Sequence, residues 1–198
     1  MNIGLTGGIA TGKSTVAGLL ARKGAHLIDL DQVAREVTAP GQPALAQIAK
    51  QFGQAVIQQD GSLDRKKLGE IVFADPVKRK QLEAITHPAI REVMHARMDD
   101  YKRRFPDGLT VVEVPLLYES GLSSHFDRVV VVYIPREEQL QRLMQRDKLS
   151  LEQAEKRLAA QIDIEEKKRM ADYTIDNRGS LKQTSEQVDR LWQALGRT

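Results

Sequence analysis

The sequence contains no cysteine, few aromatic residues and no long apolar segment. The absence of cysteine excludes disulfide bonds, thiolate nucleophiles and cysteine-ligated zinc. No apolar run approaches the roughly 20 residues that a membrane-spanning helix needs. No basic stretch followed by a long apolar one marks a secretory signal near the first residue. We therefore expect a cytoplasmic protein without a membrane anchor.

The charge balance is mildly basic, with a formal net charge of +3 and an isoelectric point of about 9.1. The basic residues gather in four clusters, Arg65–Lys67, Lys78–Lys80, Lys102–Arg104 and Lys167–Arg169. Acidic residues are mixed among most of these clusters, and aromatic residues that could stack on bases make up only 5% of the chain. We therefore interpret each cluster as a solvated helix face, and a basic nucleic-acid-binding protein stays the non-enzymatic alternative.

The chain of 198 residues, 41% of them hydrophobic, suits one compact domain with a small appended lobe. Short apolar and β-branched runs alternate with helical patterns, which predicts an α/β fold with a parallel sheet. The five expected strands are residues 3–6, 26–30, 110–114, 128–134 and 172–176. Two of these runs are almost continuously apolar, which is typical of parallel strands covered on both faces.

The expected strands are unevenly spaced along the chain. About eighty residues separate the second strand from the third, which is more than one crossover helix needs. Helical patterns at 42–52, 64–73 and 76–104 predict a helical insertion at this point. A second charged helical stretch follows the fourth strand, and Ser150 followed by Gln153 resembles a capping box that divides it into two helices.

The stretch Gly7-x-x-x-x-Gly12-Lys13-Ser14 follows the first expected strand and precedes an amphipathic helix. In that setting the backbone N–H groups of the loop and of the helix N-terminus favour an anion. Lys13 would reach the β- and γ-phosphates, and the Ser14 hydroxyl would bind Mg²⁺. The motif therefore predicts a site for a nucleoside triphosphate with Mg²⁺.

The sequence does not suit two of the three functional classes that this motif leaves open. The Asn-Lys-x-Asp motif by which GTPases bind guanine is absent, and Asp176-x-x-Gly179 lies too late to be a switch loop. A translocating ATPase usually has an acidic residue at the end of an apolar strand, which Glu113, with Pro115 after it, matches poorly. Phosphoryl transfer to an acceptor, the third class, fits better.

Asp29 and Asp31 lie at the carboxyl end of the second expected strand, which is where parallel sheets bind their ligands. If the strand continued, both side chains would point to the same face. One carboxylate could then orient or deprotonate an acceptor hydroxyl. The alternative is that Asp31 only caps the helix that follows it.

Several motifs together resemble those of the dephospho-CoA kinase family. The motifs are GLTGGIATGKSTVA, GAHLIDLDQVAREVTAPG, HPAI, VVEVPLLYESG, QRLMQRD and DYTIDNRG, and the resemblance extends from residue 2 to about residue 195. The P-loop is shared by many kinases, whereas the combination is much more specific. The family usually reads Asp-Ala-Asp at positions 29–31, and often Gly-Ser where this chain has Ala10-Thr11. Neither departure removes a side chain that the chemistry uses.

The resemblance implies ATP-dependent phosphorylation of the ribose 3′-hydroxyl of dephospho-CoA, the last step of coenzyme A synthesis. It implies a P-loop kinase core of residues 1–31, 108–136 and 171–198. It also implies a helical CoA-binding insertion of residues 32–107 and a helical lid of residues 137–170. The implied partners are ATP and dephospho-CoA, the implied cofactor is Mg²⁺, and the oligomeric state is left open.

The resemblance also implies roles for individual residues. Asp31 corresponds to the general base of the family, and Lys13 and Arg142 complete the implied catalytic set. The implied ATP-binding residues are Gly8, Ala10, Thr11, Gly12, Lys13, Ser14, Thr15, Val16, Arg146 and Asn177, the last as an adenine contact. The implied acceptor-binding residues are Asp31, His87 and Glu119, and the implied metal ligand is Ser14.

Several of these residues have alternatives. Arg146 could instead pair with Asp147, and Arg157 and Gln161 are further candidates from the second lid helix. For His87-Pro88, we favour a turn that breaks the helix over a contact with the CoA moiety.

Overall fold

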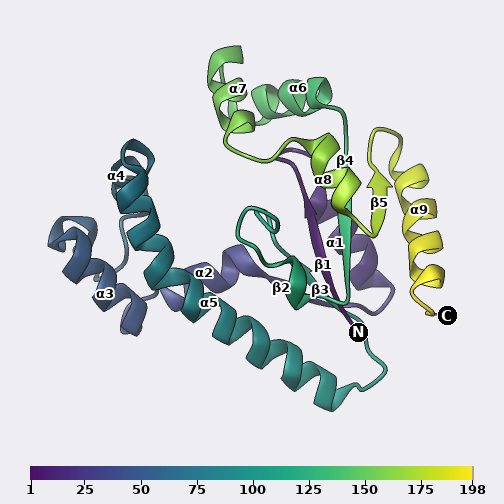
Figure 1. Ribbon diagram of the computed structural model, residues 1–198, viewed down its shortest axis with the longest axis horizontal. Coiled ribbons are helices and arrows are strands. Elements are labelled where there is room, and N and C mark those ends of the chain that lie inside the picture. Colours follow the sequence, from purple (N-terminus) through teal and green to yellow (C-terminus); the bar gives the residue numbers. More distant parts are fainter. Residues whose placement is uncertain (198) are drawn as a thin grey trace. The chain divides into compact units, whose positions relative to one another are not determined.

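The computed structural model describes residues 1–197, which divide into a first unit, residues 1–29 and 101–197, and a second unit, residues 30–100. In the described part of the chain, five parallel strands form one sheet in the order β2-β3-β1-β4-β5, all within the first unit (Figure 1). The strands are β1 (Asn2–Gly7), β2 (His26–Asp29), β3 (Thr110–Glu113), β4 (Arg128–Tyr133) and β5 (Tyr173–Asp176). The predicted parallel sheet is confirmed.

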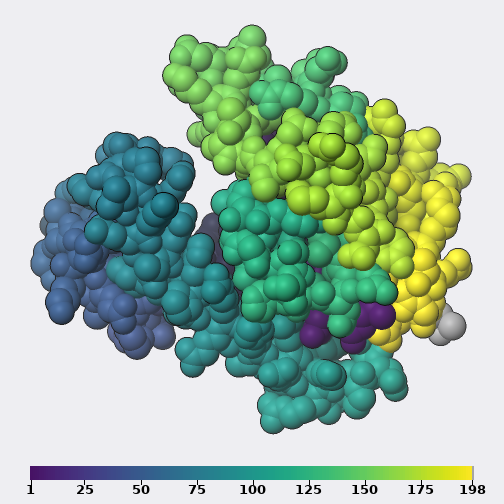
Figure 2. Space-filling model, viewed as in Figure 1, coloured from purple at the N-terminus to yellow at the C-terminus, as the bar shows by residue number. Residues whose placement is uncertain are grey.

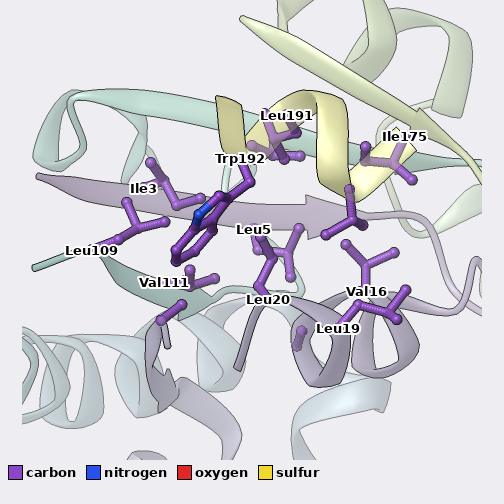
Figure 3. Packing of buried hydrophobic residues seen from close by; sticks show 14 of the residues in the cluster. Ile3, Leu5, Val16, Leu19, Leu20, Leu109, Val111, Ile175, Leu191 and Trp192 are labelled. Atoms are coloured by element: carbon purple, nitrogen blue, oxygen red, sulfur yellow. The ribbon is translucent and has the colours of Figure 1, made fainter. Parts of the chain in front are cut away.

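Both faces of the sheet are covered, as the continuous apolar runs predict. On one face, α1 (Lys13–Arg22) and α9 (Leu181–Ala194) pack on the strands, with Leu20 and Trp192 among the buried residues (Figure 3). Val130 and Val132 of β4 belong to this core. Val131 and Tyr133 alternate with them and pack on the opposite face against Ile164. Ile164 begins the short helix α8 (Ile164–Met170).

The charged stretch after β4 forms three helices, whereas the sequence predicted two. They are α6 (Arg136–Asp147), α7 (Leu151–Ala159) and α8, called here the α6–α8 segment. The predicted capping box of Ser150 and Gln153 begins α7 and is confirmed. The third helix begins because Asp163 caps it, accepting a hydrogen bond from the Glu165 N–H at 2.8 Å. In Figure 2, α7 (light green) projects from the first unit, while α8 (yellow-green) lies flat on it.

The second unit is helical and has a small core of its own. Its elements are α2 (Leu30–Val37), α3 (Pro43–Phe52), the 3₁₀ helix η1 (Gln54–Val56), α4 (Arg65–Ala74) and most of α5 (Pro76–Arg104). The three helices predicted in this region are confirmed, each with bounds within one residue of those expected. Ile48 and Val56 are fully buried in this core, beside Leu68 of α4.

The favoured turn at His87-Pro88 is wrong, because α5 continues through Pro88. A proline inside a helix removes one backbone hydrogen bond, and a helix with many other contacts can tolerate this loss. Pro88 is exposed, while Met94 and Met98 on the same helix are buried and hold it in place. The last turn of α5 belongs to the first unit, where Tyr101 stacks on His26 with ring centroids 3.9 Å apart.

The remaining short element is the 3₁₀ helix η2 (Ser123–His125), which lies between β3 and β4 in the first unit. Among residues 1–197, no helix combines the length and apolarity that crossing a bilayer requires.

Candidate active site

The phosphate loop connects the end of β1 at Gly7 with the start of α1 at Lys13. Within it the Thr11 hydroxyl donates a hydrogen bond to the Gly8 carbonyl at 2.9 Å. Gly12 is the N-cap of α1, and no side chain caps this helix end. The positive end of the α1 dipole therefore lies at the loop, as the motif predicts for an anion site.

Two glycines of the loop leave space that other side chains fill. A Cβ on Gly12 would overlap the side-chain amide of Asn177, and the φ of Gly12 is +87°, a value that disfavours other residues. A Cβ on Gly8 would overlap the side-chain amide of Gln139. Gln139 is itself fixed, because its Nε2 donates to the Ile134 carbonyl at 3.1 Å. The loop is thus held closely from two sides.

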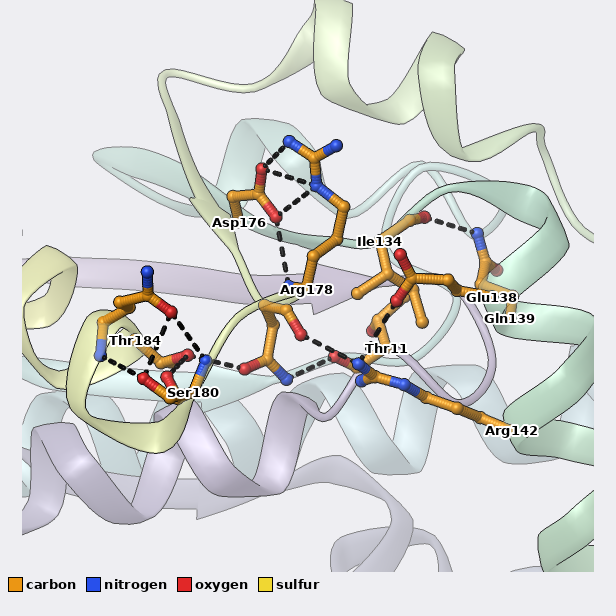
Figure 4. Close-up of polar contacts among 11 residues, drawn as sticks. Thr11, Ile134, Glu138, Gln139, Arg142, Asp176, Arg178, Ser180 and Thr184 are labelled. Atoms are coloured by element: carbon orange, nitrogen blue, oxygen red, sulfur yellow. Dashed lines mark hydrogen bonds and ion pairs between the residues drawn. The ribbon is translucent and has the colours of Figure 1, made fainter.

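Asn177 follows β5, and its buried side chain supports the loop. Its partners Thr11 and Thr184 are labelled in Figure 4. Its Nδ2 donates to the Thr11 carbonyl at 2.8 Å, and its Oδ1 accepts from the Thr184 hydroxyl at 2.8 Å. These bonds give the side chain a structural role that the sequence did not indicate. The predicted adenine contact of Asn177 stays a prediction.

Arg142 on α6 lies next to this network, as Figure 4 shows. Its Nη2 donates to the Asn177 carbonyl at 3.1 Å and lies 3.4 Å from Glu138 Oε2, and its side chain is 36% exposed. The guanidinium group is therefore partly open to solvent and bonded to the backbone of Asn177, whose side chain supports the phosphate loop. A guanidinium group can bind phosphate through charge-assisted hydrogen bonds, and the role predicted for Arg142 stays a prediction.

Arg146, also on α6, is bound to its neighbour instead. Its guanidinium group makes two bonds with the Asp147 carboxylate, at 2.7 Å and 3.2 Å, so the alternative pairing predicted for it is confirmed. Arg157 of α7 approaches the same carboxylate at 2.7 Å. The bonds from Arg146 hold the pKa of Asp147 below its usual value.

Glu119 and Gln161 take part in contacts within the first unit. The Glu119 carboxylate accepts from the Ile162 N–H at 3.0 Å and lies 2.7 Å from the Lys167 ammonium group. Gln161 follows α7, and its Oε1 accepts from the Ile9 N–H of the phosphate loop at 3.1 Å. The acceptor contact predicted for Glu119 stays a prediction.

The strand does not continue from Asp29 to Asp31, so the condition under which both side chains would point to the same face is not met. β2 ends at Asp29 and α2 begins at Leu30, so Asp31 lies in the first turn of a helix, where a carboxylate is favoured by the helix dipole. Side chains two residues apart share a face only within a strand, so the change from strand to helix at Leu30 removes the reason to expect these two side chains on one face. Asp31 and His87 both belong to the second unit.

The residues present fit a magnesium ion that obtains most of its ligands from phosphate and water. Ser14 lies in the first turn of α1 and is exposed. Within residues 1–197, no group of three or more His, Cys, Asp or Glu side chains is arranged to hold a metal ion. Mg²⁺ characteristically binds through one or two protein groups together with substrate phosphates, so a single hydroxyl at the phosphate loop is compatible with it.

Sequence reasoning missed the surroundings of two residues, Gln139 beside the phosphate loop and Lys167 on α8. Gln139 has no motif around it, and only its contact with Gly8 reveals its role. Lys167 belongs to a basic cluster expected on a solvated helix face, and this expectation is wrong for Lys167, whose side chain is fully buried. A possible signal was its position three residues after Ile164, on the apolar face of α8.

Comparison with known proteins finds relatives that match almost the whole length of this chain. The dephospho-CoA kinase family model matches residues 1–183. A dephospho-CoA kinase of Symbiobacterium thermophilum is 49% identical over 192 residues, covering 97% of this chain and 80% of the relative. The crystal structure of TT1252 from Thermus thermophilus is 35% identical, with a TM-score of 0.85, and covers 98% of this chain and 97% of its own. The structure of dephospho-CoA kinase from Campylobacter jejuni is 36% identical, with a TM-score of 0.75 and coverages of 98% and 96%. This chain belongs to the dephospho-CoA kinase family.

Proposed function

We propose that this chain transfers the γ-phosphoryl group of ATP to the ribose 3′-hydroxyl of dephospho-CoA, giving coenzyme A and ADP. The observation that carries this proposal is the supported phosphate loop, in which Asn177 holds Thr11 on one side and Arg142 on the other. The phosphate loop and the partly exposed guanidinium group of Arg142 belong to the same unit, which supports this proposal. Family membership identifies the acceptor.

The residues of the loop bind the donor. The N-terminus of α1 and the backbone from Gly8 to Gly12 receive the phosphates, and Lys13 compensates the charge of the β- and γ-phosphates. The Ser14 hydroxyl would hold Mg²⁺, which would supply positive charge against the charge of the phosphates. Arg142 adds positive charge at the transferred group, and Arg146 contributes once it leaves Asp147.

Asp31 orients the acceptor hydroxyl and accepts its proton. An ordinary aspartate has a pKa of about 4, so it is a weak base for a sugar hydroxyl. Phosphoryl transfer depends mainly on positioning and on charge stabilisation, so orientation is the larger part of this role. His87 and Glu119 are proposed as further acceptor contacts.

The chain divides into three functional parts in this proposal. Residues 1–31, 108–136 and 171–198 form the core, residues 32–107 bind the CoA moiety, and residues 137–170 act as a lid that excludes water during transfer. The cytoplasmic location stays a prediction.

The identity of the acceptor decides the proposal. The purified protein is incubated with Mg-ATP and equal concentrations of dephospho-CoA, shikimate or a nucleoside monophosphate, and ADP release and the phosphorylated product are measured. We expect rapid phosphorylation of dephospho-CoA alone. Preferential phosphorylation of another acceptor would overturn the assignment of the substrate, and no transfer to any of them would overturn the assignment of the reaction.

A further inference from the structure

A fully buried charge lies in the first unit outside the set of residues proposed for catalysis. The Lys167 side chain on α8 is 0% exposed, and its ammonium group lies 2.7 Å from a Glu119 carboxylate oxygen. Glu119 is 18% exposed and lies between β3 and β4. Burying an ammonium group without a partner is strongly unfavourable, so the two groups depend on each other. A short helix is thereby fixed to a loop at the sheet.

The same carboxylate is connected to the phosphate loop through two consecutive residues. Glu119 accepts a hydrogen bond from the Ile162 N–H at 3.0 Å. The preceding residue, Gln161, accepts one from the Ile9 N–H at 3.1 Å. The chain between α7 and α8 is therefore bound to Glu119 on one side and to the phosphate loop on the other.

The apex of the phosphate loop needs external support. Ala10 has a φ of +60°, in the left-handed region that residues with a Cβ rarely adopt. Ile9 and Ala10 pack against the apolar cluster formed by Leu143 of α6 with Ala154 and Leu158 of α7. The bond from the Ile9 N–H to Gln161 is a polar contact between this part of the loop and the chain that follows α7.

We infer that Glu119 and Lys167 act as positioning residues for ATP, because they hold Gln161 against Ile9 and so fix the apex of the phosphate loop. The inference rests on the proposed function, since it concerns the donor site of the same reaction. It assigns to Glu119 a role at the donor side, through Gln161, that differs from the predicted contact with the acceptor. It also gives a function to a lysine that the reaction itself does not use.

The first experiment removes the contact to the loop. Gln161→Met keeps the size of the side chain and removes the acceptor of the Ile9 N–H. We expect the Kd for ATP, measured by isothermal titration calorimetry, to rise about 5- to 10-fold, as for loss of one hydrogen bond. The KM for dephospho-CoA and the melting temperature should remain near those of the unaltered protein. Gln193→Met, at an exposed position on α9, is the matched control and should change neither constant. An unchanged Kd for ATP in Gln161→Met would overturn the inference.

The second experiment removes the support behind Gln161. The double variant Glu119→Leu/Lys167→Met replaces the buried pair by apolar groups of similar size, a change that is often neutral for stability. We expect its Kd for ATP to rise as much as in Gln161→Met, and adding Gln161→Met should cause no further rise. Glu152→Gln, which breaks an exposed ion pair with Lys156 on α7, is the control for the loss of a carboxylate.

The outcomes separate this inference from its alternatives. If the rises in the Kd for ATP caused by Gln161→Met and by Glu119→Leu/Lys167→Met multiply when the changes are combined, Glu119 does not act through Gln161. A rise in the KM for dephospho-CoA alone would place the carboxylate at the acceptor, and this too would overturn the inference. If the double variant fails to fold, the inference can still be overturned by an unchanged Kd for ATP in Gln161→Met. Failure of the unaltered protein to phosphorylate dephospho-CoA would refute the proposed function, whereas the Kd for ATP tests the positioning role separately.

Discussion

The side-chain amide of Asn177 donates a hydrogen bond to the backbone carbonyl of Thr11 at 2.8 Å, although 166 residues separate the two in sequence. This bond joins the end of β5 to the phosphate loop at the end of β1, while β4 lies between the two strands in the sheet. The same residue accepts a bond from Arg142 through its backbone carbonyl. The proposed donor site therefore depends on Asn177, a residue outside the phosphate loop that binds the loop backbone.

Replacing Asn177 by alanine should damage both stability and donor binding. Asn177→Ala removes the buried donor to the Thr11 carbonyl and leaves the Thr184 hydroxyl only its longer bond to the Ser180 carbonyl at 3.3 Å. We expect the free energy of unfolding, measured by urea denaturation, to fall by about 1–3 kcal/mol, with weaker binding of ATP by calorimetry. Thr184→Val is the control, because it removes only the hydroxyl and leaves the bond to Thr11. It should lower stability by about 1 kcal/mol and leave the Kd for ATP nearly unchanged. Equal effects of both variants on this Kd would contradict the argument.

Two glycines of the same region should respond in opposite ways to alanine. Gly12→Ala introduces a Cβ that overlaps Asn177 at a φ of +87°, so we expect loss of ATP binding and of transfer. Gly18 lies inside α1, and a Cβ there meets nothing within 4 Å. Gly18→Ala should raise the free energy of unfolding by about 0.5–1 kcal/mol, because alanine restricts the unfolded chain, and leave activity intact. Thermal unfolding and a coupled ADP assay test both variants, and an active Gly12→Ala protein would be the contrary result.

The fold was largely predictable because its signals are local. Apolar runs such as the one within 128–134 lie in strands covered on both faces, and the capping box at Ser150 is formed by neighbouring residues. The phosphate loop was predictable because its function requires small residues and a lysine at fixed spacing. Contacts between distant segments were not predictable. Nothing near Lys167 indicates that Glu119 will neutralise it, and the pairing of Asn177 with Thr11 exists only after the sheet has formed.

Asp31→Asn tests the proposed acceptor base. An amide retains the size of the side chain but cannot accept the proton, so we expect kcat to fall by roughly 100-fold or more while ATP binding is retained. Steady-state kinetics and calorimetry with ATP measure the two effects. Asp29→Asn is the comparison, because Asp29 is the neighbouring carboxylate at the end of β2. A larger loss of kcat in Asp29→Asn than in Asp31→Asn would contradict the proposal and would identify Asp29 as the acceptor base.

The ion pair between Asp147 and Arg146 predicts a specific dependence of stability on pH. Hydrogen bonds from Arg146 hold the folded-state pKa of Asp147 below the ordinary value of 3.8. A carboxylate with a lowered folded-state pKa adds stability that is fully present above its unfolded-state pKa and is lost as the pH falls through the folded-state value. In Asp147→Asn this contribution is absent at every pH.

The difference in melting temperature between the unaltered protein and Asp147→Asn should therefore be constant from pH 7 to 5 and should shrink below about pH 4. High salt should reduce it throughout, since the pair lies near the surface and is screened by ions. Asp99→Asn, at an exposed position on α5, controls for the loss of one carboxylate. Thermal unfolding by circular dichroism in steps of half a pH unit measures all three proteins. A difference that grows as the pH falls would mean that Asp147 is not stabilised by its arginine in the folded chain.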